Sequence, residues 1–173
     1  MWYYDTDHPL RRFFSGLAEH TFAADLGVAD PPLIDYLSLL LSRFVHVDAI
    51  HRLQVGSGKA LPEVADMLLE AEGLPPAGRT SREVYRHIGD YTLFWTGLYP
   101  EALKRLRSVM HKDHFIDYCE QGKRSYYLAS TYEAEPYRDE APVLRRLSEQ
   151  FEVCAYGLSQ LRKEWEGKPH GPS

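Results

Sequence analysis

Residues 142–166, PVLRRLSEQFEVCAYGLSQLRKEWE, contain the clearest structural pattern of the chain. Apolar residues recur along this stretch at alternating spacings of three and four, which places them on one face of an α-helix. These residues are Leu144, Leu147, Phe151, Cys154, Leu158, Leu161 and Trp165. Pro142 suits the first turn of such a helix, and Gly167 with Pro169 ends it. The pattern predicts one continuous helix of about 37 Å, packed through this face against the rest of the protein.

The same periodicity predicts two helices near the start of the chain, at Pro9 and Pro31, each opened by a proline that follows a capping residue. The first carries an apolar face made of Leu10, Phe13, Phe14, Leu17, Thr21 and Ala24. His20 flanks this face, which suggests a buried histidine. The second helix is apolar on nearly all sides from Leu33 to Val45, as is typical of a helix at the centre of a protein.

Four further helices are expected in the middle of the chain. A short one begins at Pro62 and ends before Gly73. The next begins at the capping-box sequence Thr80-Ser81-Arg82-Glu83 and extends to Gly97. A short basic helix follows from Pro100 to Leu106. The fourth carries apolar and small residues at helical spacing, namely Phe115, Cys119, Gly122, Tyr126 and Ala129.

Three helical faces with near-heptad spacing indicate helices that pack antiparallel at about 20°. We therefore predict an all-α protein, a single-domain antiparallel helical bundle of about five long and two short helices. The domain would cover residues 1–173, with tails at 1–7 and 167–173. Gly89 and Gly122 fall inside predicted helices, where glycine usually marks close contact between helices. The alternative at these positions is the close approach of a ligand or cofactor.

Composition restricts the partners of the protein. The chain has 173 residues, enough for one domain with its own core. Lys and Arg total 20 and Asp and Glu total 25, and a net charge of −5 gives no reason to expect a nucleic acid or an anionic membrane as partner. No apolar run reaches the roughly 20 residues of a membrane span, and the N-terminus has no signal-peptide pattern. We expect a cytoplasmic protein.

Sequence motifs of common enzymes are absent. The chain contains neither a glycine-rich nucleotide loop nor a nucleophile elbow nor the paired-histidine motif of zinc proteases. Its two cysteines, Cys119 and Cys154, fall on apolar helical faces and are interpreted as small buried residues. The sequence therefore favours a protein without catalytic activity and leaves an enzyme open.

Two groups of residues have side chains suited to metal binding. Glu83, His87 and Asp90 are four and three residues apart on one predicted helix, so they share a polar stripe. The second group, at the junction of two helices, consists of His111, His114 and Asp117. Imidazoles with carboxylates bind zinc or iron, so these residues are candidate ligands, although no cofactor is predicted. The alternatives are a solvated helix flank for the first group and a capped helix end for the second.

We expect the chain to act by binding another protein or a second copy of itself as a homodimer. The reason is the lack of catalytic motifs together with an aromatic content of 13%, since Tyr and Trp are enriched at interfaces. Two alternatives remain: a metal-dependent enzyme that uses the candidate ligands, and a sensor with an aromatic ligand pocket near Trp95 and Tyr126. The aromatic residues expected in the core are Phe13, Phe44, Tyr91, Trp95, Phe115, Tyr126, Phe151 and Trp165.

Overall fold

The structure is a computed structural model that describes residues 9–56, 64–75, 78–101 and 117–167. Every regular element in these ranges is a helix. The elements are α1 (Pro9–Ala18), the π-helix η1 (Glu19–Asp25), α2 (Pro31–Gly56), α3 (Val64–Glu72), α4 (Arg79–Leu98), α6 (Tyr118–Ser130), α7 (Ala141–Glu149) and α8 (Phe151–Gly167). The protein is an all-α helical bundle, as the periodicity predicts.

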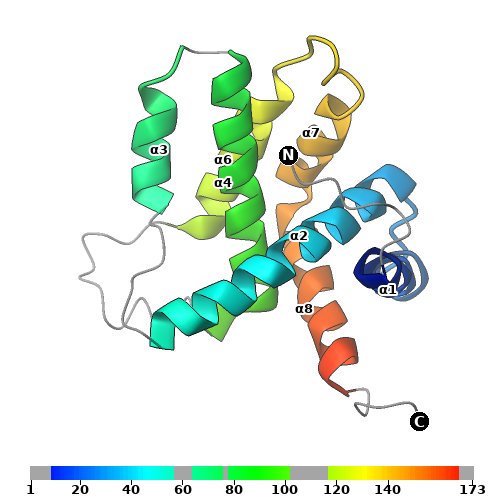
Figure 1. Ribbon diagram of the computed structural model, residues 1–173. Coiled ribbons are helices and arrows are strands. Elements are labelled where there is room, and N and C mark those ends of the chain that lie inside the picture. The colour runs from blue at the N-terminus through cyan, green and yellow to red at the C-terminus, as the bar shows by residue number, and fades with distance from the viewer. Residues whose placement is uncertain (1–8, 57–63, 76–77, 102–116, 168–173) are drawn as a thin grey trace.

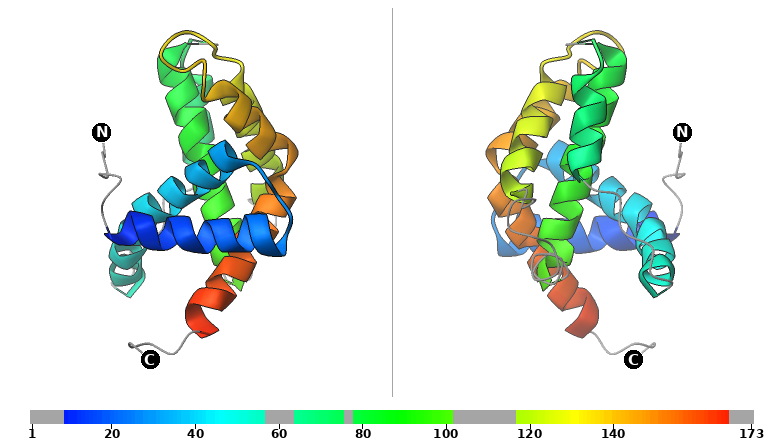
Figure 2. Two further views of the ribbon diagram at one scale, coloured as in Figure 1. Left: turned by 90° about the vertical axis from the view of Figure 1, so that its right-hand side faces the viewer. Right: turned by 90° about the vertical axis from the view of Figure 1, so that its left-hand side faces the viewer.

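Helix α4 is the central element of the bundle. It packs against α6, against the shorter α3, and against α8 near its C-terminal end. Figure 1 shows that α4, α6 and α7 alternate in direction, as the heptad-like spacing predicts. Helix α2 crosses this group obliquely, and α1 packs against α2 (Figures 1 and 2). The antiparallel arrangement therefore holds for α4, α6 and α7, and the first two helices lie across it.

The apolar face of α2 confirms the prediction of a central helix. Its described side chains from Leu33 to Phe44 include six large apolar residues, none more than 6% exposed. They belong to one core with buried residues of α1, α4, α7 and α8, and α2 itself packs against α1, α4 and α7. Trp95, Tyr126 and Phe151 belong to the same core, as predicted, whereas Phe13 is 43% exposed and Phe14 takes the buried position beside it.

The C-terminal stretch is not one continuous helix. It bends at Gln150, whose backbone leaves the helical conformation between α7 and α8. The apolar face is nevertheless buried on both sides of the bend, with Leu144, Leu147, Phe151 and Cys154 no more than 1% exposed. The two halves pack on different partners, because α7 lies along α6 whereas α8 packs on α4 and the first helices. The bend lets one apolar face serve both contacts.

The first helix changes type after Ala18, which the regular spacing does not predict. In η1 the hydrogen bonds join residues five apart, as between the Leu26 N–H and the Thr21 carbonyl oxygen, 3.0 Å apart. The wider turn changes which residues face the core. Phe22 is completely buried, and Ala24, predicted on the buried face, is exposed.

The Phe22 ring packs directly on Gly157 of α8. A Cβ atom added to Gly157 would lie 2.2 Å from this ring, so only glycine fits there without rearrangement. This contact joins η1 to α8. His20, one helical step away from the packed face, is exposed, and the prediction of a buried histidine is therefore wrong.

Gly89 and Gly122 mark close contacts between helices, as predicted. A Cβ at Gly89 would lie 2.6 Å from the Tyr126 ring, and one at Gly122 would lie 2.4 Å from the Phe151 ring. Side chains of neighbouring helices fill both positions, so neither glycine makes room for a ligand.

Some predictions concern residues outside the described ranges. They include the short basic helix after Glu101, Phe115, and the tails 1–7 and 168–173, whereas Gly167 is the last residue of α8. Among the described helices, none combines the length and the apolar character required to cross a bilayer.

Candidate functional site

The first predicted ligand group does not meet at one point. Asp90 is completely buried, whereas Glu83 and His87 are exposed. Glu83 pairs with Arg82, and the His87 ring stacks on Phe44 with 6.1 Å between the ring centroids. Since α4 is a regular helix here, the three residues share a stripe but direct their side chains to different partners.

Asp90 is the centre of a buried polar cluster that joins three helices. Its Oδ1 accepts hydrogen bonds from the hydroxyls of Tyr36 on α2, at 2.6 Å, and Tyr126 on α6, at 2.7 Å. Its Oδ2 accepts a hydrogen bond from the Arg43 guanidinium. A further guanidinium, of Arg86, lies above the Tyr36 ring. Both carboxylate oxygens of Asp90 are thus engaged within the protein.

The electrostatics of this cluster favour an ionised carboxylate. Burial alone would raise the pKa of Asp90, but the positive charges of Arg43 and Arg86 and the two tyrosine hydrogen bonds outweigh it. The pKa of Asp90 therefore lies below its usual range. Burial and the charge of Asp90 raise the pKa values of Tyr36 and Tyr126, so both remain donors. The cluster is a saturated ion pair that holds α2, α4 and α6 together.

The second predicted ligand group is only partly described. His111 and His114 lie outside the described residues. Asp117 is the N-cap of α6, and its Oδ1 accepts a hydrogen bond from the Glu120 N–H at 3.2 Å. Asp117 thus caps the start of α6, whereas the expected alternative, a histidine at a helix C-terminus, concerns His111 and lies outside the described residues.

Trp95 and Tyr126 are core residues. Trp95 is 6% exposed and packs on Phe94, Tyr91 and Tyr99. Tyr126 is fully buried and uses its hydroxyl in the Asp90 cluster. Neither residue lines the pocket that the structure describes elsewhere.

A pocket of about 310 Å³ opens between α3, α4 and α6. Figure 1 shows the end of α3, the start of α4 and the end of α6 at the same end of the molecule. Its walls combine apolar side chains with several hydroxyls and with the charged side chains of Glu72 and Arg82. The lining residues are Ala71, Glu72, Leu74, Gly78, Ser81, Arg82, Tyr85, Leu128, Thr131 and Tyr132.

The start of α4 forms the polar wall of this pocket. The N-cap is Gly78, which has no side chain to bond the first-turn amides, and the predicted capping box at Thr80 is therefore wrong. Glu83, its expected partner, pairs instead with Arg82. The first turn of a helix carries a partial positive charge and unpaired N–H groups. Because no side chain of the described residues caps this start, its charge is left to be met by water or a ligand.

Arg82 is the fixed cation of the same wall. Its side chain is almost fully buried, ion-paired to Glu83 and to Glu140, and lies 4.1 Å from the centre of the Tyr137 ring. The Nε of Arg82 is buried and has no hydrogen-bond partner among the described residues. These contacts fix the guanidinium in place, and its charge is largely balanced by the two carboxylates.

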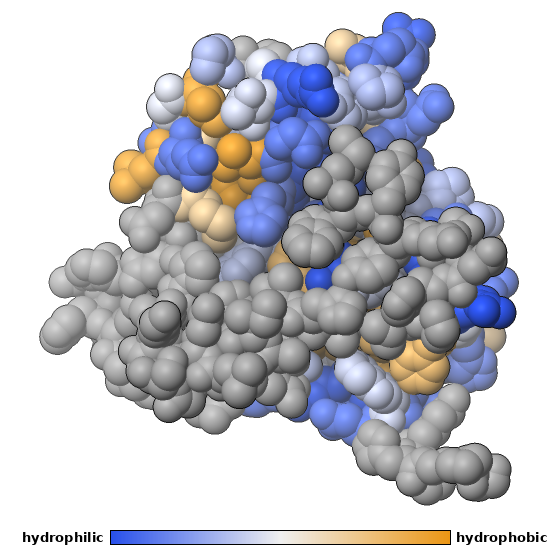
Figure 3. All heavy atoms as spheres, in the orientation of Figure 1, coloured by the Kyte–Doolittle hydropathy of each residue, from blue (hydrophilic) through white to orange (hydrophobic). Residues whose placement is uncertain are grey.

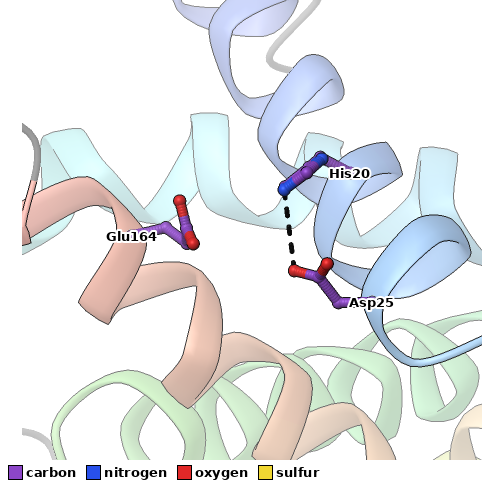
Figure 4. A group of neighbouring side chains, drawn as sticks. All are labelled: His20, Asp25 and Glu164. Carbon is purple, nitrogen blue, oxygen red and sulfur yellow. Dashed lines mark ion pairs between the residues drawn. The ribbon is translucent and has the colours of Figure 1, made fainter.

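One set of three ligand-type side chains lies close together in the described part of the chain, and it was not predicted. His20 and Asp25 of η1 and Glu164 of α8 each offer one ligand atom, all within 4.8 Å of one another (Figure 4). The signal in the sequence is weak, because His20 and Asp25 are five residues apart and would diverge on a regular α-helix.

Neither cysteine is set up as a nucleophile. Cys154 is buried, and burial raises the pKa of its thiol to about 12. Cys119 is half-buried, and burial together with the negative charges of Glu152 and Asp117 raises its pKa to about 11. Both thiols are protonated at neutral pH, whereas thiol chemistry needs the thiolate.

The exposed hydrophobic side chains are spread over several helices. Among the described residues they are Phe13, Leu69, Tyr127, Val153 and Tyr156. Figure 3 shows apolar surface over α3 and its boundary with α4. Val153 and Tyr156 are one turn apart on α8, which places them on the same side of that helix. Association with a protein or a second copy stays a prediction, which light scattering of the purified chain tests.

Comparison of the chain with protein-family models, with curated proteins and with solved structures returns no match.

Proposed function

We propose that this chain is a non-catalytic binding protein that holds a small molecule in the pocket between α3, α4 and α6. The observation that carries the proposal is the pocket itself, an opening of about 310 Å³ against the uncapped start of α4. Its volume lies at the lower end of the range of small-molecule sites, about 300–1,000 Å³. The cytoplasmic location and the absence of nucleic-acid partners stay predictions.

The lining supports a ligand with two unlike ends. Leu74, Leu128 and Ala71 provide an apolar surface that an alkyl or ring portion of the ligand would cover. The uncapped amides of α4 and the Ser81 hydroxyl favour a hydrogen-bond acceptor at the other end. A molecule with an apolar body and a carboxylate or carbonyl end matches both surfaces.

Three probes with the same six-carbon chain test this proposal: hexanoate, hexanol and hexylamine. Amide chemical-shift changes in ¹H–¹⁵N NMR spectra report where each probe binds. We expect the affinity order hexanoate, then hexanol, then hexylamine, because the start of α4 attracts acceptors and repels a cation. Shifts confined to other surfaces, or tightest binding by hexylamine, would contradict the proposal.

A pair of tryptophan variants separates the pocket from the nearby surface. Leu128→Trp fills the pocket and should abolish the hexanoate shifts. Leu69→Trp is the matched control, because Leu69 is 68% exposed and does not line the pocket, and it should leave the shifts unchanged. Thr131→Trp places the same bulk at an exposed lining position and replaces Leu128→Trp if that variant does not fold.

A further inference from the structure

The π-helix explains how His20 and Asp25 come together. Their spacing of five places them on different sides of an α-helix, which advances 100° per residue. In η1 the hydrogen bonds span five residues, so residues at that spacing lie about one turn apart on one side. The Nε2 of His20 lies 3.6 Å from the Oδ2 of Asp25. π-Helical turns of this kind are frequent at functional sites.

Glu164 reaches the same space from α8. Figure 4 shows the side chains of His20 and Asp25 converging with that of Glu164 in the space between η1 and α8. The packing of Phe22 on Gly157 holds these two helical segments against each other. A buried contact therefore joins the two segments that carry the three residues, although His20 and Asp25 are exposed.

The distances suit a small divalent ion. Zinc binds histidine nitrogen and carboxylate oxygen at about 2.0–2.2 Å, so two ligand atoms in a tetrahedral site are about 3.4 Å apart. The His20–Asp25 separation of 3.6 Å is close to this value. The largest separation in the set, up to 4.8 Å, closes through rotation of the exposed side chains.

We propose that His20, Asp25 and Glu164 form a binding site for a divalent transition-metal ion of the zinc type. Two carboxylates balance the charge of the ion, and the imidazole selects zinc-like ions over Mg²⁺ and Ca²⁺, which prefer oxygen ligands. Three protein ligands leave a fourth position for water or an external ligand. Because the ligands come from η1 and α8, the bound ion joins the π-helix near the start of the chain to the last described helix.

Isothermal titration with zinc chloride tests the site, with magnesium chloride as the comparison ion. We expect His20→Ala and Glu164→Gln each to weaken zinc binding at this site at least tenfold. Glu19→Gln is the matched control, because Glu19 lies in the same π-helix, is exposed, and is outside the ligand set. It removes one negative charge and should leave zinc affinity unchanged.

The chain has eight histidines, so zinc can also bind away from His20. The site is therefore identified by comparing the unaltered chain with His20→Ala. In histidine-selective NMR spectra, the imidazole signal that disappears in His20→Ala should shift when zinc is added to the unaltered chain. Equal zinc affinity of the unaltered chain, His20→Ala and Glu164→Gln would overturn the proposal, as would magnesium binding as tight as zinc. Circular dichroism melting without metal verifies that each variant is folded.

Discussion

The carboxylates of Asp90 and Asp25 lie in opposite surroundings. Asp90 is completely buried, and both of its oxygens accept hydrogen bonds from within the protein. Asp25 is half exposed, and the single ion pair described for it, with His20, is long at 3.6 Å. A buried carboxylate whose two oxygens already accept hydrogen bonds stabilises the fold and is not accessible to a ligand or metal ion. An exposed carboxylate with one long ion pair adds little stability, and its oxygen lone pairs stay available to a ligand such as a metal ion.

The largest expected effect comes from removing the buried charge. Asp90→Asn leaves the guanidinium of Arg43 beside a neutral group, and breaking a buried ion pair costs about 3–5 kcal/mol. Asp25→Asn is the matched change at the exposed cluster and should cost less than about 0.5 kcal/mol. Urea unfolding followed by circular dichroism measures both. A cost below about 1 kcal/mol for Asp90→Asn would mean that the cluster is not a stabilising ion pair.

A smaller effect is expected from removing one donor. Tyr126→Phe keeps the buried ring against Gly89 but deletes the hydrogen bond to Oδ1 of Asp90. Hydrogen bonds to charged groups contribute about 1.5–3 kcal/mol. Tyr127→Phe, on the neighbouring exposed tyrosine, is the control and should leave the free energy of unfolding unchanged. Equal unfolding curves for the two variants would contradict the role assigned to the Tyr126 hydroxyl.

Acid provides a reversible version of the same test. The folded-state pKa of Asp90 is depressed, so its contribution to stability is fully present above the ordinary aspartate pKa of about 3.9. That contribution is lost gradually as the pH falls through the lower folded-state value. Urea unfolding between pH 6 and pH 2 should show a loss for the unaltered chain that is reduced in Asp90→Asn. Parallel pH profiles for the two chains would show that the pKa of Asp90 is the same in the folded and the unfolded protein, and would contradict the lowered folded-state value.

The smallest effect is expected at the exposed cluster without metal. His20→Ala should change the free energy of unfolding by less than about 0.5 kcal/mol, because the imidazole is exposed and its ion pair lies in water. A loss above about 1 kcal/mol in metal-free buffer would give His20 a structural role and remove the contrast with Asp90.

The sequence predicts those helices whose apolar residues recur at regular spacing. The buried faces of α4 and α6 and the close contacts at their glycines can be predicted from local periodicity, because every residue on such a face packs against another helix. The partners of Asp90 do not follow in this way. Tyr36 and Tyr126 are 54 and 36 residues away from Asp90 along the chain. The sequence therefore indicates a polar stripe on α4 but not the tyrosines that bond Asp90 in the core.

Departures from regular helix geometry were the other limit of prediction. The helix bends at Gln150 although the apolar repeat continues across this position, and no proline or glycine in the sequence marks the bend. The π-helix after Ala18 also has no composition signal, and its wider turn exchanges Ala24 for Phe22 on the buried face. At both places the chain packs against distant helices, and the spacing of residues within one helix does not record that packing.

The contact between Phe22 and Gly157 has a consequence for the order of folding. During synthesis the segment containing Phe22 leaves the ribosome long before Gly157 is made, since chains emerge from the N-terminus. Until α8 is complete, the ring has no glycine surface to cover it. The two segments then meet across most of the chain. The entropy cost of closing this long loop rises only slowly with its length, but the loop cannot close until α8 has been made. The side of the bundle formed by η1 and α8 therefore cannot be completed during synthesis before α8 has been made.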